Sequence, residues 1–427
     1  MKLVLSNPFE PPRLIDQLWG TTTIQDCLVA LKFGLKKREL VQGPILMEYE
    51  REFARQVGVR FAVSFASGRA AFFALLKSFQ INDGEEVLLQ AQTHIVVPNA
   101  VRFAGGKPVF VDCDLDTLNM NLERVSQKIT SRTRFLVIQH TFGVPVELDS
   151  ALTLAKEYNL ILIEDCVHAL GATYKGCRVG SFGQAAFFST EETKIISSTM
   201  GGMAVTDDPV IAERLRDIQE CCAWPEQAIV WRCLLKLVIY HLFTQPLLHR
   251  FTRPVYMWLR KNLHVRLGPV ATSNDEMFGR QPAGYMQRLS NGQACVALRQ
   301  LRRLDVNIQH RRAIARAFRD EFSKRGFHIV KPPIDSQPAY VRYPIMVSDR
   351  SAAIEAVSNS VILGQWFSSV LEESASPEFG GYILGSCPNA ELVAKHLVNV
   401  PTHFRIRLKD VKPIVNGLGS FVWKPND

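Results

Sequence analysis

The chain has 427 residues, 47% of them hydrophobic and 21% charged, a composition typical of a globular protein with room for more than one domain. Its apolar N-terminus is interrupted at Asn7-Pro8, too early for a secretory signal, and nine cysteines without a CxxC pair indicate reduced thiols, so we expect a cytoplasmic protein with neither disulfides nor a metal site. The net charge of +9 is concentrated, because residues 227–274 contain seven basic residues and no acidic one.

Short apolar runs alternate with amphipathic stretches from about residue 60 onward. The runs are Phe61–Phe65, Glu86–Leu89, Pro108–Val111, Phe135–Ile138 and Leu160–Ile163. They lack polar alternation, as strands covered on both faces do, and the stretches between them are long enough for helical crossovers. The pattern predicts an α/β fold in which a mostly parallel sheet lies between two layers of helices.

A glycine turn follows the first of these runs. Ser67-Gly68 separates it from the helical stretch Arg69–Leu76. Because the first backbone amides of a helix have no partners within the helix, this turn is a candidate phosphate-binding site. Ser67 has a simpler role open to it as well, that of a helix cap.

The pattern changes near Leu298. Apolar residues at 298, 301, 304 and 308 keep helical spacing and predict one long connecting helix. An apolar run at Val341–Val347, a helical stretch at Ala390–Ala394 and another run at Leu397–Pro401 follow. We therefore divide the chain into an N-terminal segment (1–45), a large domain (46–300) and a smaller C-terminal α+β domain (301–427).

Lys194 is the main candidate for covalent chemistry. It lies in the segment Phe188–Gly202, between an apolar run and a glycine pair, where a Schiff-base lysine could sit. Asp165 ends another apolar run, and the carboxyl ends of parallel strands are where such sheets bind ligands. Asp165 is thus a candidate partner for a cationic ring. The residues alone leave open a solvated lysine and a helix-capping or solvated aspartate.

The motif Glu164–Ala172, together with Ser189 and Lys194, resembles the DegT/DnrJ/EryC1/StrS family of pyridoxal-phosphate-dependent sugar aminotransferases. Further similar stretches are Gln42–Pro44, Ser67–Ala71, Thr93-His94, Pro108–Asp112 and Cys387–Glu391. The resemblance covers most of the chain outside about residues 224 to 280. It implies the fold type I of transferases that use pyridoxal 5'-phosphate (PLP), and PLP as the cofactor.

The resemblance also implies three catalytic roles. Lys194 would form the internal aldimine and move the proton, Asp165 would face the pyridine nitrogen, and His168 would hydrogen-bond the ring phenolate. A carboxylate beside the ring nitrogen favours the protonated ring, which stabilises a carbanion at the substrate α-carbon. The lysine must be neutral to attack or to abstract a proton, and desolvation lowers its pKa in that direction.

Four further residues correspond to cofactor-binding positions of the family. His94 falls where an aromatic side chain stacks on the cofactor ring. Gly68, Arg69 and Ser189 fall where backbone amides, charge and a hydroxyl would converge on the cofactor phosphate. Without the resemblance, His94 would be interpreted as a loop histidine and Arg69 as a surface arginine.

Two positions depart from the family pattern. Thr199-Met200 stands where Gly-Glu is usual, although Gly201-Gly202 is kept. Met286 stands where many members have an asparagine that reaches the cofactor phosphate of the neighbouring subunit, a hydrogen bond that a thioether cannot donate. Arg69 could supply phosphate charge instead. We expect the loop geometry to survive, and specificity or subunit contact to differ.

The predicted function is transfer of an amino group from glutamate or glutamine to a nucleotide-linked keto-sugar by a homodimer with a shared active site. The alternatives are a cyclitol ketone as the acceptor, a PLP-dependent sugar dehydratase of the same fold, and a non-catalytic regulatory relative. The resembling dehydratases have histidine in place of the lysine, so Lys194 disfavours dehydration. A non-catalytic role would not require Asp165, His168, Ser189 and Lys194 together.

Residues 227–274, here called the basic segment, carry apolar residues at helical spacing. These are Trp231, Leu234, Leu235, Val238, Ile239 and Leu242. We expect two amphipathic helices, the second after Pro254. One hypothesis is that residues 228–268 lie on an anionic membrane or receive a lipid-linked or nucleotide-linked sugar. The favoured interpretation is a subunit-facing lid whose apolar side packs on the main fold. No nucleic-acid recognition motif accompanies the charge, so we do not expect a nucleic-acid partner.

Overall fold

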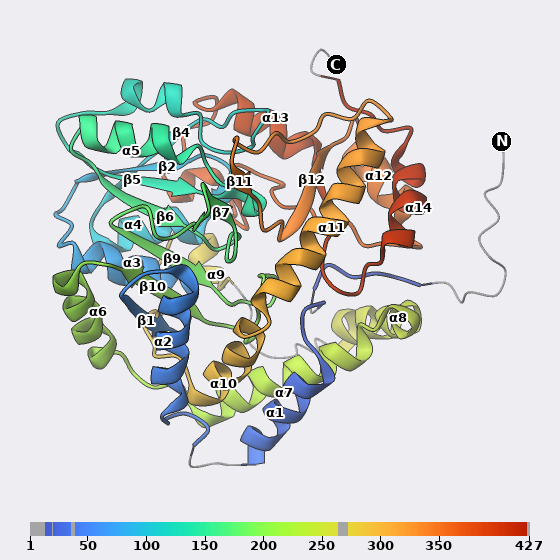
Figure 1. The fold of residues 1–427 in the computed structure, drawn as a ribbon, viewed down its shortest axis with the longest axis horizontal. Helices are drawn as coiled ribbons and strands as arrows, with labels where there is room; N and C mark the ends of the chain where they lie inside the picture. The colour runs from blue at the N-terminus through green and yellow to red at the C-terminus, as the bar shows by residue number, and fades with distance from the viewer. Residues whose placement is uncertain (1–12, 19, 36–38, 264–271, 425–427) are drawn as a thin grey trace.

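The computed structural model describes residues 13–18, 20–35, 39–263 and 272–424. A seven-stranded sheet forms its centre, in the order β1-β10-β9-β6-β5-β2-β4 (Figure 1). Its strands are β1 (Phe61–Phe65), β2 (Glu86–Gln90), β4 (Lys107–Val111), β5 (Thr133–Gln139), β6 (Ile161–Asp165), β9 (Ala185–Ser189) and β10 (Gly202–Thr206). The five apolar runs predicted as strands correspond to β1, β2, β4, β5 and β6.

The sheet is mostly parallel and is covered on both faces. Strand β10 runs antiparallel to β1 and β9, and the other neighbouring pairs are parallel. Successive side chains of a strand point to opposite faces, so Leu162 and Ile163 of β6 belong to two different apolar cores. One core includes α3 (Gly68–Ser78), α4 (Val96–Ala104) and α6 (Pro209–Cys221); the other includes α2 (Ile45–Val57), α5 (Leu148–Glu157) and α10 (Asn291–Leu301). The predicted three-layer α/β/α arrangement is confirmed.

The predicted long connecting helix is wrong, because the structure has two helices there. Helix α10 ends at Leu301, and α11 (Leu304–Ser323) begins after Arg302-Arg303. Arg303 leaves the helical conformation, and its guanidinium forms a 2.7 Å ion pair with Asp26 of α1 (Ile24–Leu35). The apolar spacing continues across this break because both helices bury their apolar residues in one core, so the sequence pattern does not show the break.

The C-terminal elements share an apolar core with α3 and α4. They are β12 (Arg342–Met346), α12 (Arg350–Val357), α13 (Pro388–His396), β14 (Leu397–Pro401) and α14 (Leu408–Leu418), with β12 antiparallel to β14. The two predicted runs and the predicted helical stretch correspond to β12, β14 and α13. The division into a large and a small domain at residues 300/301 stays a prediction.

Several short elements connect these parts. Strand β3 (Thr93–His94) pairs in parallel with β13 (Leu371–Glu372), and β7 (Thr173–Tyr174), β8 (Cys177–Arg178) and β11 (Ser336–Gln337) form a small sheet. The short helices are α9 (Asn274–Met277) and the 3₁₀ turns Leu122–Arg124, Ser126–Lys128, Thr141–Gly143 and Pro377–Gly380. The β3–β13 pair brings a C-terminal loop next to the segment that follows strand β2 of the central sheet.

The basic segment forms helices α7 (Gln227–Phe243) and α8 (Pro246–Leu263), with a bend of 117° between them. The prediction that the second helix starts after Pro254 is wrong, because α8 begins at Pro246 and continues through Pro254. Proline suits a first helical turn, and the carbonyl of Arg250 that Pro254 leaves without its helical donor lies on an exposed part of α8. Among the described residues no single helix is long and apolar enough to cross a membrane; α7 with α8 up to Leu259 reaches that length and composition only as a bent pair.

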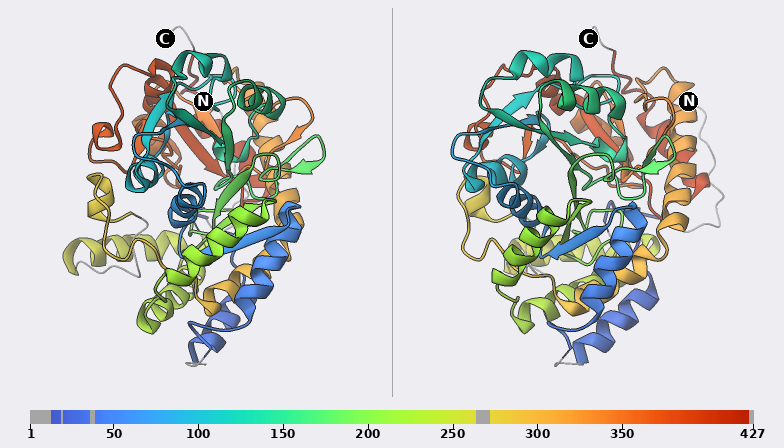
Figure 2. Two further views of the ribbon diagram at one scale, coloured as in Figure 1. Left: turned by 90° about the vertical axis from the view of Figure 1, so that its left-hand side faces the viewer. Right: turned by 60° about the vertical axis from the view of Figure 1, so that its left-hand side comes forward.

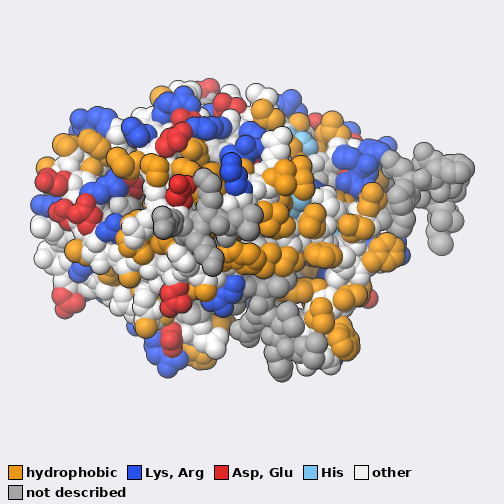
Figure 3. Space-filling view, turned by 90° about the horizontal axis from the view of Figure 1, so that it is seen from below, with side chains coloured by type: hydrophobic (Ala, Val, Ile, Leu, Met, Phe, Trp, Pro, Cys, Tyr) orange, Lys and Arg blue, Asp and Glu red, His pale blue; other side chains and the backbone are white. Residues whose placement is uncertain are grey.

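The two helices differ in what they bury. Val230, Leu234 and Leu237 of α7 pack in a core shared with α1 and α10. An apolar side of α7 thus packs on the main fold, as predicted, although this side differs from the predicted one, since Trp231 and Leu242 are exposed. The subunit-facing lid stays a prediction. Helix α8 instead projects from the body of the molecule (Figure 2). The underside that carries α1, α7 and α8 shows a broad gathering of hydrophobic side chains (Figure 3).

Candidate active site

Lys194 is half-buried in the loop between β9 and β10. Its ammonium nitrogen lies 4.4 Å from the ring centre of Trp366, and its backbone amide donates to the carbonyl of Glu191 (3.1 Å). Burial lowers the pKa of Lys194 to about 8, against the opposing effect of Glu191 and Asp165. A lysine in this state is a far better nucleophile and base at neutral pH than a solvated one.

Asp165 lies at the end of β6, paired with Phe187 of the neighbouring strand β9. The two strands are parallel, so their carboxyl ends bring Asp165 and the loop of Lys194 to the same edge of the sheet. Asp165 is buried and accepts a hydrogen bond from the backbone amide of Val167 (3.1 Å). Burial raises the pKa of Asp165 to about 6, although the Val167 amide and Lys194 act in the opposite direction.

His168 follows Asp165 on a tight turn and lies among aromatic rings. It stacks on Trp366 with ring centres 5.0 Å apart, and on Phe142 at 6.1 Å. Burial and, second, the charge of Lys194 hold the pKa of His168 well below its usual value, so the imidazole is neutral. Its Nδ1 is buried and has no hydrogen-bond partner among the described residues. A buried unpaired ring nitrogen is costly, which points to a ligand partner.

His94 ends β3 and faces the C-terminal part of the chain. Its Nδ1 accepts a hydrogen bond from the amide of Val96 (3.4 Å), and its Nε2 lies 3.4 Å from a carboxylate oxygen of Glu373. The contact with His94 lowers the pKa of Glu373 to about 2, so this carboxylate is ionised. The pairing fixes the imidazole plane, as a ring that stacks on a cofactor requires.

The proposed phosphate-binding turn has two backbone close approaches. A Cβ on Gly202 would lie 2.2 Å from the carbonyl oxygen of Ser67, and one on Gly68 would lie 3.0 Å from Cβ of Ser189, so the glycine pair and Gly68 let these segments meet. Ser67 caps α3 by accepting from the amide of Ala70 (3.3 Å). Ser189 accepts from the amide of Glu191 (3.3 Å) at the same end of the helix.

Arg69 and Met286 flank this turn. Arg69 forms a 2.6 Å ion pair with the buried carboxylate of Glu276. Because this carboxylate already neutralises the guanidinium, Arg69 would add little positive charge at the cofactor phosphate. Met286 is partly buried and packs against the core of the α3 face. Its thioether therefore contributes to packing.

Helix α7 contacts the loop of Lys194 at two points. Thr199 adopts a left-handed conformation with φ of 75°, unusual for a β-branched residue, and its hydroxyl donates to the carbonyl of Cys233 (2.9 Å). Glu192 forms a 2.6 Å ion pair with Lys236, and both side chains are largely buried. Burial, reinforced by the neighbouring Glu191, raises the pKa of Glu192 to about 7, with Lys236 opposing. The loop beside the lysine is thus built partly on the basic segment.

Three residues near Lys194 carry no sequence signal. Trp366 contacts Lys194 and His168, and Arg342 of β12 places its guanidinium carbon 3.8 Å from the centre of the Trp366 ring. Glu373 pairs with His94 as described above. All three come from the C-terminal part of the chain, where nothing in their spacing marks them, so only the fold brings them to the lysine.

A second buried cluster, His140, Glu164 and Cys166, has atoms close enough to hold a metal ion. Glu164 instead accepts hydrogen bonds from the backbone amides of Gly180, Phe182 and Gly183 and contacts His140 Nε2 at 3.0 Å. With its oxygens occupied in this way, Glu164 anchors the loop between β6 and β9.

The residues at this edge fit PLP. Four features correspond to four groups of PLP. A half-buried lysine with a lowered pKa corresponds to the aldehyde, and a buried carboxylate at an adjacent strand end corresponds to the ring nitrogen. An imidazole nitrogen without a partner among the described residues corresponds to the phenolate, and a helix N-terminus with a close glycine approach corresponds to the phosphate. These four features come from Lys194, Asp165, His168 and the Gly68 turn.

The sequence profile of the DegT/DnrJ/EryC1/StrS aminotransferase family matches residues 24–231 and 261–419. The chain belongs to this family. It is therefore a PLP-dependent aminotransferase, and the suggested family membership, fold type I and cofactor are confirmed. The profile leaves out residues 232–260, which are most of α7 and the larger part of α8.

The chain is similar to individual proteins as well. Protein MJ1066 of Methanocaldococcus jannaschii is 28% identical over 397 residues, 91% of this chain and 92% of that protein. GDP-perosamine synthase of Escherichia coli O157:H7 is 36% identical over 173 residues, 40% of this chain and 48% of that protein. Among solved structures, DesV of S. venezuelae in complex with a ketimine intermediate has the same fold, with a TM-score of 0.72, 24% identity, and coverage of 93% of this chain and 94% of that one.

Proposed function

We propose that this aminotransferase moves an amino group from glutamate or glutamine to a nucleotide-linked keto-sugar, with Lys194, Asp165 and His168 as its catalytic residues. The observation that carries the assignment of residues is their place at one sheet edge: Asp165 ends β6, and the loop of Lys194 follows the adjacent parallel strand β9. A ring nitrogen of His168 lies there without a partner among the described residues. The amine of Lys194 is brought towards neutrality and the carboxyl of Asp165 is buried beside it. Groups whose environments shift their pKa values in this way are typical of acid–base sites.

Bound PLP supplies an electron sink for the carbanion that forms at the substrate carbon. The chain provides the rest. Asp165 holds a proton at the ring nitrogen, because a carboxylate there favours the charged ring. His168 donates to or accepts from the ring oxygen through its unpaired nitrogen. Lys194, when neutral, takes the proton from the substrate carbon of the donor and returns one to the acceptor. Trp366 keeps water from the amine.

The cofactor-binding roles of Gly68, Arg69, His94 and Ser189 are part of the same proposal. Gly68 and Ser189 meet at the helix N-terminus, which supports a phosphate contact. His94 is oriented by Glu373, which supports stacking on the ring. Arg69 is the weakest of the four, since Glu276 already neutralises its charge.

The choice of a nucleotide-linked sugar is supported by the relative named as a GDP-perosamine synthase. A cyclitol ketone uses the same chemistry and stays an alternative acceptor. Dehydration is disfavoured by the lysine, as the sequence already indicated. We further propose a cytoplasmic homodimer with a shared active site, and this part of the proposal rests on the family assignment.

The test is chemical and locates the lysine directly. Purified protein with added PLP is expected to develop a visible absorbance, and borohydride reduction followed by peptide mapping should place the cofactor on Lys194. Lys194→Ala should lose the adduct, and amino transfer from glutamate to nucleotide keto-sugars should fall by at least about a hundredfold. Lys175→Ala, at an exposed lysine, is the matched control. An adduct on another lysine, or none, would refute the assignment.

A further inference from the structure

The apolar residues of α8 are largely exposed. Leu247, Phe251, Val255 and Trp258 recur at intervals of four, four and three, which places them on one stripe of the helix. Each is at least half exposed, and Phe251 is 71% exposed. Removing these four side chains from water would be strongly favourable, and an exposed apolar patch of this kind is typical of a surface that binds a membrane or another molecule.

Basic residues line a second side of α8. At 3.6 residues per turn, Arg250, Arg253 and Lys261 lie together on the flank next to the apolar stripe, and all three are exposed. No acidic residue occurs between Glu226 and Asp275. An apolar stripe with a basic flank is the pattern of helices that lie in the interface of an anionic membrane.

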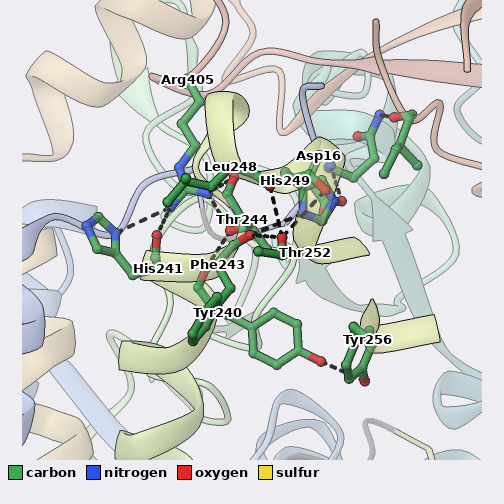
Figure 4. A network of polar contacts seen from close by, with 12 residues as sticks. Asp16, Tyr240, His241, Phe243, Thr244, Leu248, His249, Thr252, Tyr256 and Arg405 are labelled. Carbon is green, nitrogen blue, oxygen red and sulfur yellow. Dashed lines mark hydrogen bonds and ion pairs between the residues drawn. The ribbon is translucent and has the colours of Figure 1, made fainter. Parts of the chain in front are cut away.

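The third side of α8 is fixed to the protein. His249 Nε2 lies 3.3 Å from Asp16 Oδ2, the hydroxyl of Thr252 donates to the carbonyl of Phe243 (2.6 Å), and the hydroxyls of Tyr240 and Tyr256 are 3.0 Å apart (Figure 4). These contacts hold α8 at a set angle to α7.

The bend itself is held by the C-terminal part of the chain. Arg405 donates to the carbonyls of Thr244 (2.7 Å) and His241 (3.1 Å) at the end of α7 (Figure 4). Helix α8 is thus a projecting helix with a fixed orientation, whose apolar stripe faces away from these contacts. The larger part of α8, up to Arg260, also lies in the segment that the family profile leaves out.

We propose that α8 lies on an anionic lipid bilayer, with the stripe Leu247, Phe251, Val255 and Trp258 in the interface and the basic flank at the lipid headgroups. A second copy of this chain is the less suitable occupant. In a twofold contact the same patch meets itself, which would bring two basic flanks together with no acidic residue of α7 or α8 to balance them. The proposal is independent of which sugar is aminated.

Substitutions in α8 test this better than removal of the segment, because α7 contributes to the core and to the loop of Lys194. The full-length protein is sedimented with phosphatidylcholine vesicles, with and without added phosphatidylglycerol. We expect pelleting only with the anionic vesicles, and less of it at high salt. Phe251→Ser with Trp258→Ser should lower partitioning by at least about tenfold.

Arg250→Glu with Arg253→Glu should lower partitioning by about 25-fold or more, at about fivefold for each basic residue lost. Ile383→Ser with Leu384→Ser, at exposed apolar positions outside the basic segment, is the matched control and should pellet like the unchanged protein. PLP absorbance confirms that each variant is folded.

The proposal would be overturned if the unchanged protein pelleted equally with the neutral and the anionic vesicles. It would also be overturned if the α8 variants pelleted with anionic vesicles as much as the Ile383→Ser, Leu384→Ser control. Light scattering after size-exclusion chromatography tests whether a second copy of the chain covers the stripe instead. If Phe251→Ser with Trp258→Ser reduces the mass of the lipid-free assembly, the stripe belongs to a contact between copies of the chain. The membrane assignment then fails.

Discussion

At the scale of single residues, the environment of Lys194 determines its reactivity. Its pKa falls from an ordinary 10.5 to about 8, and burial is the main cause. A shift of that size corresponds to about 3 kcal/mol. The cation–π contact with Trp366 favours the charged form by about 1–2 kcal/mol, which is less than the opposing effect of burial.

We therefore expect the reaction of the cofactor-free protein with PLP to follow the neutral fraction of Lys194. Its rate should fall about tenfold for each pH unit below a midpoint of about 8. In Trp366→Ala water reaches the amine, and the midpoint should move up towards 10.5; Trp366→Phe should keep it near the original value. Stopped-flow absorbance measures the rates. A midpoint that stays the same or falls in Trp366→Ala would show that Trp366 does not desolvate the lysine.

At the scale of elements, helix α7 supports the loop that carries Lys194. The buried ion pair between Glu192 and Lys236 and the Thr199 hydroxyl bond to Cys233 join the two. The pKa of Glu192 is raised to about 7 in the folded protein, above its ordinary 4.5. Ionisation of Glu192 therefore costs stability as the pH rises through about 7, and Lys236 offsets that cost.

Lys236→Met should lower the free energy of unfolding by about 3 kcal/mol at about pH 8, because Glu192 would be left as an unpaired buried charge. At about pH 5.5 Glu192 is protonated, so the loss should shrink. The double variant Glu192→Gln with Lys236→Met should recover most of the loss at the higher pH. Urea unfolding at both pH values measures this. A loss that is independent of pH, or one that the double variant does not recover, would contradict the ion-pair account.

At the scale of the whole molecule, the C-terminal elements do not have a separate apolar core. One continuous cluster runs from α3 and α4 through β12, β14 and α14. The N-terminal segment adds to this connection: Arg13 forms a 2.6 Å ion pair with Asp410, and Ile15 bridges to Val361. The parts on either side of residue 300 should therefore lose their structure together.

Thermal unfolding followed by far-ultraviolet circular dichroism and by tryptophan fluorescence should show coincident transitions. Arg13→Ala removes an ion pair whose side chains are both less than a fifth exposed, and should lower the stability by about 1–3 kcal/mol without splitting the transition. Arg280→Ala, in a pair with Asp275 in which both side chains are more than half exposed, is the control and should change it little. Two separated transitions would instead support independent domains divided near residue 300.

Local patterns were enough to predict much of this protein. Unbroken apolar runs identified five strands of the sheet, because strand periodicity is a property of neighbouring residues. The resemblance to the family predicted the roles of Asp165, His168, Ser189 and Lys194, because its motifs also consist of neighbouring residues. Errors arose where local spacing continued across a change of direction, as at Arg302-Arg303, and where a proline stayed inside an exposed helix, as at Pro254.

The sequence by itself determined the fold class and the family, and it predicted the lysine with its partners along the chain. Only the tertiary structure brought Trp366, Arg342 and Glu373 to that lysine, buried one helix of the basic segment and left the apolar stripe of the other exposed. The physical reason is that a lowered pKa and an exposed apolar face depend on what surrounds a side chain. Those surroundings come from segments far apart in the sequence, whose contacts local spacing does not encode.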